Sequence, residues 1–272
     1  MSESSSMPSW QRKGIALLPL GILLFALLTI FAAYRATFQS GVLDFQHGRV
    51  VTPPISMLMF AGPGRRIGQV GFPMVSILFG CCAPTFFGGV AKTVGEAHKT
   101  LLASLRNTSM IAFCCLAVVG LLPLQADLAL VITHQAPVHW TSIVHQTAAA
   151  FFFLFCIVHM GIWLYFCRVS CDSRLFLHAT KSPKSFWIKS ACFVLCFLPL
   201  PTAFMLHPIS PARRHFHYLS KADAGGLTQY ALVTCVAGFF ASYSCELWHL
   251  QKQQEEPERK QAETSKSRQK DD

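Results

Sequence analysis

The sequence predicts an all-α membrane protein, a bundle of six transmembrane helices with both termini in the cytosol. Apolar residues make up 52% of the chain and charged residues only 13%, about half the charge that soluble domains carry. The mean hydropathy is +0.41. The apolar residues also come in blocks of roughly 20, the length that crosses about 30 Å of hydrocarbon. Together these observations exclude a soluble domain.

Six such blocks divide the chain, and each predicts one transmembrane helix. The third block is the weakest of them, because Pro123 interrupts its end and proline breaks a helix interior. The predicted spans are Gly14 to Tyr34, Val70 to Val90, Thr108 to Gln125, Ser142 to Cys167, Phe186 to Leu206 and Leu227 to Leu250.

The first block has two interpretations, a cleavable signal peptide or an uncleaved anchor. Arg12 and Lys13 form a basic flank that suits both. The apolar run is longer than the roughly 7 to 15 residues of a signal-peptide core, which favours the anchor. We therefore expect a cytosolic N-terminus over residues 1–13, a membrane domain over 14–250, and a disordered cytosolic tail over 251–272, where the chain is polar.

Basic residues predict the orientation, because Lys and Arg near span ends stay on the cytosolic side. With the N-terminus inside, the cytosolic segments hold 16 of the 23 Lys and Arg residues, and the luminal segments hold 7. Lys189 is counted on the cytosolic side. The net charge of +10 is spread over these loops, so we expect membrane lipids as partners and no nucleic acid.

The first luminal loop contains an apolar stretch from Ile55 to Phe60, followed by a Gly-Pro-Gly turn and the pair Arg65 and Arg66. The stretch is too short to span the bilayer and too apolar to lie in water. It should lie in the interface or re-enter the bundle. The two arginines would then lie at headgroup depth, where they either bind a phosphate or simply extend toward water.

The last luminal loop carries Arg213 and Arg214, followed by His215 and His217. The two histidines would share one face of an extended backbone. A metal ion would need a further ligand, and no HExxH or CxxC motif is present. The loop therefore fits an anion site better than a metal site, and we expect no metal and no cofactor.

The fourth block contains two histidines, His145 and His159, fourteen residues apart. On a helix they lie within roughly 40° of one face but about 21 Å apart along the axis, so they cannot share one metal ion. His145 lies near the luminal surface. His159 lies deep and should face the bundle interior, where a Ser, Thr or carbonyl group satisfies it or where it relays protons.

Several short segments, in this order, resemble one family of six-span proteins. This family contains post-GPI-attachment-to-proteins factor 2, the damage-regulated autophagy modulators and the yeast suppressor-of-four-kinase protein, and the resemblance is greatest to the GPI-attachment branch. Gln229-Tyr230 departs from the family, in which an acidic residue tends to precede the aromatic one. The matching segments are Pro54-Ile55-Ser56, Gly71-Phe72, Val144-His145-Gln146, Val158-His159-Met160 and the run KSFWIK at 184–189.

The resemblance implies a Golgi or endoplasmic-reticulum membrane protein needed for lipid remodelling of GPI anchors, with the anchors or the proteins that carry them as partners. The sequence shows no nucleophile elbow, HExxH motif or phosphate loop, so a non-enzymatic factor is favoured. Two alternatives remain open. One is a membrane-embedded acyltransferase or lipase using a luminal histidine such as His145, and the other is a lysosomal or plasma-membrane modulator of autophagy or phosphoinositide signalling.

The luminal arginines suggest where a lipid would bind. Positive charge is disfavoured on the luminal side, so two Arg pairs there indicate a use for them. We expect Arg65, Arg66, Arg213 and Arg214 to bind an anionic lipid headgroup on the luminal face, with His145 lining the same site.

Overall fold

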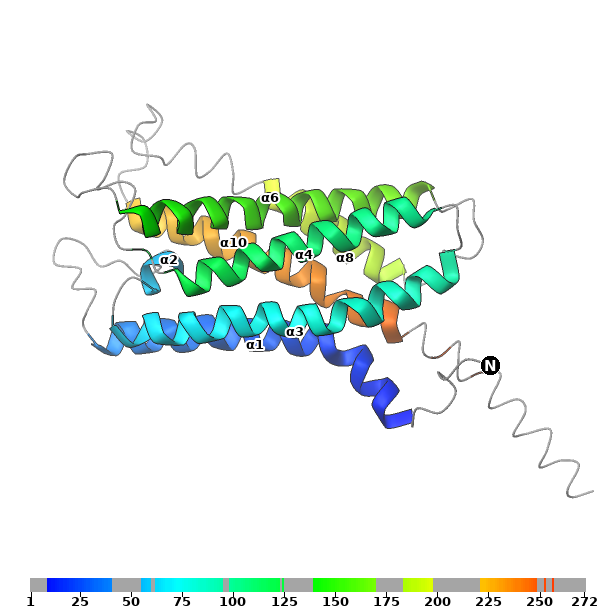
Figure 1. Cartoon of the computed structure of the whole chain (residues 1–272), viewed down its shortest axis with the longest axis horizontal. Coiled ribbons are helices and arrows are strands. Elements are labelled where there is room, and N and C mark those ends of the chain that lie inside the picture. The colour runs from blue at the N-terminus through cyan, green and yellow to red at the C-terminus, as the bar shows by residue number, and fades with distance from the viewer. Residues whose placement is uncertain are drawn as a thin grey trace, which may run out of the picture.

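In a computed structural model of the protein, every described element is a helix, and the helices run side by side as a bundle (Figure 1). All structural statements below concern the described part of the chain. It comprises residues 9–40, 55–59, 62–94, 98–122, 124, 139–169, 183–197, 221–248, 252 and 256.

Six longer helices and one single-turn helix make up this bundle. After α10 a turn at Ser242 leads into a further helical stretch over 243–248. The helices are α1 (Ser9–Ser40), α2 (Ile55–Leu58), α3 (Gly62–Val94), α4 (Lys99–Leu121), α6 (Trp140–Val169), α8 (Pro183–Phe197) and α10 (Lys221–Ala241).

Five of these helices are long and apolar enough to cross a membrane. They provide the spans Ala16–Ser40, Gly62–Gly88, Lys99–Leu121, Trp140–Cys167 and Gly226–Trp248. The sixth, α8, contributes a shorter apolar stretch, Ser185–Phe197, and the rest of the predicted fifth span lies outside the described residues. The chain is thus an all-α, multi-pass membrane bundle, as its sequence predicts. Its orientation in the membrane stays a prediction.

All six longer helices begin earlier than the predicted spans, and the difference is largest for α3 and α4. α4 begins at Lys99 rather than Thr108, so Lys99 and Arg106 lie on an exposed helical surface instead of in a loop. α3 begins at Gly62, so the Gly-Pro-Gly segment is its first turn. Gly62 has a φ of 68°, which glycine tolerates, and the next residue, Pro63, suits the start of a helix because its missing N–H has no helical partner there. Hydropathy marks the hydrocarbon-crossing part of a helix, whereas helical hydrogen bonding continues beyond it.

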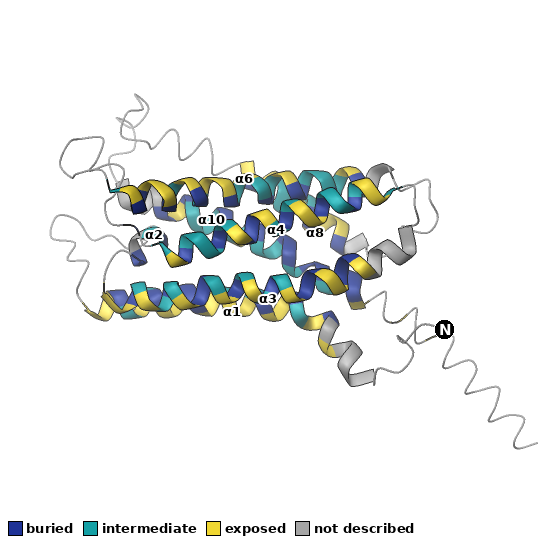
Figure 2. Cartoon of the chain, in the orientation of Figure 1, coloured by how far each residue is buried: buried dark blue, intermediate teal, exposed yellow. Residues whose placement is uncertain are grey.

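The helices pack in sequence order around a common centre. α1 lies along α3, α3 along α4, and α4 along α6, while α8 packs mainly on α10. Exposed residues, yellow in Figure 2, follow the outward faces of the long helices. Many are large and apolar, including Leu28, Phe31 and Trp187. Such faces suit contact with lipid chains, because these helices satisfy their own backbone hydrogen bonds.

Figure 1 also distinguishes the two ends of the bundle. At one end, α2 contacts α1, α3 and α10, and α3, α6 and α10 begin there. We call this the α2 end. The opposite end holds the start of α4 and the last turns of α3, α6 and the helical stretch over 243–248. By the orientation that the sequence predicts, the α2 end is luminal.

Candidate functional site

A cavity of about 150 Å³ lies at the centre of the bundle. Its walls come from α1, α2, α3, α4, α6 and α10, whereas α8 contributes no residue to them. The walls are almost wholly apolar and rich in phenylalanine, with members such as Phe79 on α3 and Phe152 on α6. Phe79 stacks on Phe113 of α4, with ring centroids 3.7 Å apart, and meets Phe240 of α10 edge-on. These rings hold three helices together along one side of the cavity.

The cavity is long and follows the helix axes. Its lining extends on α3 from Phe72 to Phe87, about 22 Å at 1.5 Å per residue. On α10 and the following turn it extends from Gln229 to Tyr243, about 21 Å on the same basis. Its oxygen and nitrogen groups lie near the two extremes, with Gln229 toward the α2 end and the Tyr243 hydroxyl at the other.

At the α2 end, the single turn α2 packs against α1, α3 and α10. Ile55, Leu58 and Met59 are buried, and Ile55 and Met59 line the cavity. The Ile55 amide donates to Gln229 Oε1 at 2.8 Å, and a threonine hydroxyl from α1 donates to the Leu58 carbonyl at 3.2 Å. Of the two predicted placements, in the interface or within the bundle, the buried side chains of Ile55, Leu58 and Met59 agree with the second, whereas Phe60 lies outside the described residues.

Close approach of α3 to α2 depends on glycine. A Cβ atom at Gly64 would lie 2.5 Å from the Leu58 carbonyl oxygen, closer than a carbon can come to backbone. The first turn of α3, which carries the predicted arginine pair, is thus pressed against α2.

The two arginines of α3 differ in their surroundings. Arg65 is half-buried and Arg66 is exposed. Arg65 precedes Phe72 by seven residues, which at 100° each places it within about 20° of the cavity-lining face of α3. Arg66 is offset from Arg65 by a further 100° or so. Only Arg65 continues the line of the cavity wall. Arg213 and Arg214 lie outside the described residues, so their predicted proximity to Arg65 stays a prediction.

His145 belongs to the cavity wall near the α2 end. It lies five residues after α6 begins, is only 1% exposed, and lines the cavity. Its Nδ1 lies 2.7 Å from the Leu122 carbonyl oxygen at the end of α4. Because a carbonyl oxygen only accepts hydrogen bonds, Nδ1 carries the hydrogen. This bond fixes the ring at the wall, between the ends of α4 and α6.

His159 is fully buried and hydrogen-bonded, as its depth in the sequence predicts. Its Nδ1 lies 2.9 Å from the Leu105 carbonyl oxygen, so this nitrogen is the donor. Its Nε2 contacts the Tyr243 hydroxyl, which can then donate to it. The imidazole also stacks on Phe240, with centroids 5.1 Å apart. Both ring nitrogens have a hydrogen-bond partner, one of them a carbonyl group. This agrees with the first of the two predicted roles, a buried histidine whose polar groups are satisfied by its neighbours.

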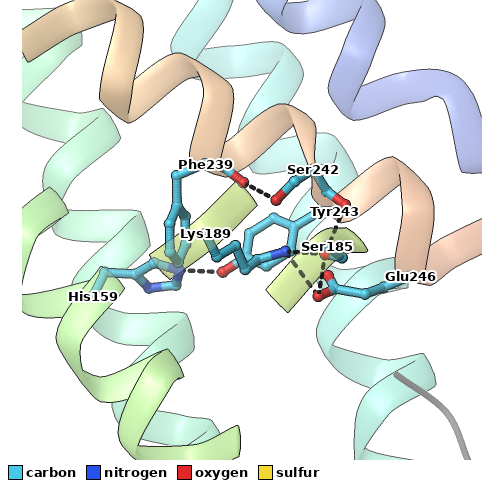
Figure 3. A network of polar contacts seen from close by, with 7 residues as sticks. All are labelled: His159, Ser185, Lys189, Phe239, Ser242, Tyr243 and Glu246. Atoms are coloured by element: carbon cyan, nitrogen blue, oxygen red, sulfur yellow. Dashed lines mark hydrogen bonds and ion pairs between the residues drawn. The ribbon is translucent and has the colours of Figure 1, made fainter. Parts of the chain in front are cut away.

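A buried ion pair lies next to His159, and the sequence analysis did not predict it (Figure 3). Lys189 of α8 is 1% exposed, and its Nζ lies 2.8 Å from Glu246 Oε1. Ser185, one helical turn before Lys189, accepts from Lys189 Nζ at 3.1 Å and donates to the same carboxylate oxygen at 3.0 Å. The count of cytosolic charges included Lys189, and the structure places this residue inside the bundle, where a carboxylate from another helix pairs with it.

Aromatic rings enclose the ammonium group as well. Lys189 Nζ lies 4.2 Å from the Tyr243 ring centroid, and 5.4 Å from the centroids of Trp163 and Phe239. Such contacts stabilise a desolvated cation. Tyr243 thus has three roles, since its hydroxyl contacts His159, its ring faces Lys189, and it lines the cavity. We call this set the inner polar cluster, and it comprises His159, Ser185, Lys189, Tyr243 and Glu246.

A signal for this cluster exists in the sequence. Lys189 falls inside the predicted fifth span and Glu246 inside the predicted sixth span. Ionisable residues within membrane spans are rare and are usually paired with one another. One cation and one anion in two spans predict an ion pair between them. The Oε2 atom of Glu246 has no hydrogen-bond partner within the described part of the chain.

The fold and these features define a multi-pass helical membrane protein with a central apolar cavity between a basic, α2-capped end and a buried charged cluster. No family model, curated protein or solved structure matches the chain. Within the described ranges, no three His, Cys, Asp or Glu residues lie close enough together to hold a metal ion.

Proposed function

We propose that the protein recognises an anionic lipid headgroup at the α2 end and takes part in the lipid remodelling of GPI anchors. The supporting observation is the first turn of α3. It carries Arg65 and Arg66 and no acidic residue, although the positive end of a helix dipole lies there. Two cations at this place are unfavourable by about 0.3–1 kcal/mol each unless an anion accompanies them. A phosphate at a helix N-terminus satisfies both the dipole and the arginines.

The position of Arg65 connects this anion site with the membrane. Arg65 is half-buried, next to α2 and in line with the cavity wall, whereas a purely solvent-facing arginine would resemble Arg66. A headgroup phosphate bound at Arg65 would have its glycerol near the α2 end, close to the depth of His145. Arg213 and Arg214 would complete the site from the last luminal loop.

The biological assignment rests on the family resemblance of the sequence and on the predicted luminal position of the α2 end. A GPI anchor is a phosphoinositide-glycan lipid of the luminal leaflet, so a luminal headgroup site in the Golgi or endoplasmic reticulum fits its recognition. A non-enzymatic role is favoured because the sequence shows no nucleophile elbow, HExxH motif or phosphate loop.

The experiment replaces both arginines of α3 with glutamine in cells that lack the native protein. Arg65→Gln with Arg66→Gln should leave protein level and targeting unchanged but impair the lipid composition of GPI anchors. Lysine at both positions should restore it only in part, because the bidentate guanidinium fork is lost.

The matched control is Arg35→Gln, an exposed arginine near the same end of the bundle on α1. It should behave as the wild type. Full restoration of GPI lipid composition by the double glutamine variant would disprove the proposal. A steady-state location in lysosomes would favour the autophagy branch of the family instead.

A further inference from the structure

We propose that the central cavity binds one hydrocarbon chain of a membrane lipid, with its polar end toward α2 and its methyl end toward Tyr243. This inference deepens the proposed function, because it assigns the hydrocarbon part of the lipid whose headgroup the α2 end would hold. It rests on four features of the cavity: its wall chemistry, its length, the placement of its polar groups, and its closed inner end.

The wall chemistry selects an apolar guest. Aliphatic and phenylalanine side chains from five long helices form nearly all of the surface. Cavities of this size with apolar walls do not hold water and take up apolar molecules. A chain that moves in from the bilayer leaves one apolar medium for another, so its affinity comes from close packing against fixed walls.

The length of the cavity selects a long guest. The lining on α3 covers about 22 Å, compared with about 15 Å for one leaflet of a hydrocarbon core some 30 Å thick. The cavity also runs parallel to the spanning helices, the direction in which acyl chains lie in a bilayer. A compact ring-shaped ligand would leave most of this length unfilled.

The polar groups of the wall give the chain a direction. Ser56, His145 and Gln229 line the cavity, and all three lie toward the α2 end. The Ser56 hydroxyl and the Gln229 amide N–H can donate hydrogen bonds to the ester oxygens of a lipid, whereas His145 Nε2 can accept one from a lipid hydroxyl. Farther along the cavity the wall offers little but hydrocarbon, so the apolar tail would lie there.

The inner end is closed by aromatic side chains. Phe86, Phe87 and Tyr243 are all nearly fully buried, with centroids 4.4 Å apart between Phe86 and Tyr243 and 5.0 Å apart between Phe86 and Phe87. Tyr243 is held by His159 and by the Lys189 ammonium. Because the inner polar cluster fixes this floor, the cavity limits how long a bound chain can be.

The test uses the full-length protein in phosphatidylcholine vesicles with a trace of photoreactive lipid. The probes are phosphatidylcholine and phosphatidylinositol, each with a diazirine on a palmitoyl chain, and the cross-linked residues are mapped by mass spectrometry. We expect labels on the cavity-lining residues Phe152 and Val236 in addition to lipid-exposed positions such as Leu154.

Two neighbouring alanines of α6 provide a matched pair of variants. Ala149 lines the cavity, whereas Ala150 is exposed on the outer face. Ala149→Phe should reduce labelling of Phe152 and Val236 by about tenfold, a loss within the range that overpacking costs, and Ala150→Phe should leave it unchanged. Phe86→Ala removes part of the floor, so a second pair of probes with the diazirine on a longer, stearoyl chain should label the inner residues more strongly in this variant than in the wild type. If Ala149→Phe fails to fold, Phe86→Ala tests whether the cavity binds a lipid chain.

The phosphatidylcholine probe separates this inference from the proposed function. If inner labelling appears with both probes and persists in the double glutamine variant of Arg65 and Arg66, the chain site stands without the headgroup site. If labels occur only on lipid-exposed residues, or if Ala149→Phe leaves inner labelling intact in a folded protein, the chain site is disproved whatever the headgroup result.

Discussion

The central cavity and the inner polar cluster are neighbours that share Tyr243, yet the cavity is lined by apolar side chains and the cluster is built around charged ones. The cavity has apolar walls along most of its length, so anything bound there is held by packing and can be exchanged. The cluster surrounds an ammonium and a carboxylate with fixed hydrogen bonds and aromatic rings. Charge in a low-dielectric interior needs permanent partners, and a binding site needs replaceable ones. The molecule keeps the two apart, with one aromatic side chain between them.

The helices also differ in which of the two regions they form. α8 takes no part in the cavity wall, but it delivers Ser185 and Lys189 to Glu246 beyond α10. The long helices enclose the binding space, and the short one fixes its inner end.

The largest expected effect comes from breaking the ion pair. Lys189→Met or Glu246→Gln leaves one polar partner buried without its counterpart, which should cost about 3–5 kcal/mol of stability. The double variant Lys189→Met with Glu246→Met should recover most of this loss, because no uncompensated charge remains. Thermal unfolding in detergent measures the stability of the wild type, the two single variants and the double variant.

Lys99→Met, at an exposed lysine of α4, serves as the control and should change little. If the two single variants were as stable as the wild type, the cluster would not be the fixed element described above.

A smaller effect is expected at the shared residue. Tyr243→Phe keeps the ring that faces Lys189 and lines the cavity, but it removes the hydroxyl that contacts His159. Leaving a buried imidazole nitrogen without a partner should cost about 1–3 kcal/mol. Tyr165→Phe, at an exposed tyrosine of α6, is the control in the same unfolding assay. Equal stability of the two variants would contradict the hydrogen bond between Tyr243 and His159.

Much of the bundle could be predicted from the sequence, because hydropathy and helix periodicity are local properties. Blocks of apolar residues indicate the long helices, and the depth of His159 within one block indicates its burial. The short apolar stretch after Pro54 indicates, for the same reason, a place in the interface or within the bundle.

The remaining features depend on relations between distant residues. Lys189 and Glu246 are 57 positions apart, and a count of loop charges treats each separately. The cavity is a space left between several helix surfaces, so no single segment encodes it. The difference between Arg65 and Arg66 follows from helical phase, but only once α3 is known to begin at Gly62 rather than Val70.

The central claim, that the α2 end and the cavity bind one anionic lipid together, is tested most directly by native mass spectrometry of the purified protein in mixed lipid. The wild type should retain phosphatidylinositol in preference to phosphatidylcholine with a matched chain. Arg65→Gln with Arg66→Gln should abolish the preference but keep lipid bound, and Ala149→Phe should lose both lipids. A wild-type protein that retains the two lipids equally, or an Ala149→Phe variant that retains them as well as the wild type does, would contradict the claim.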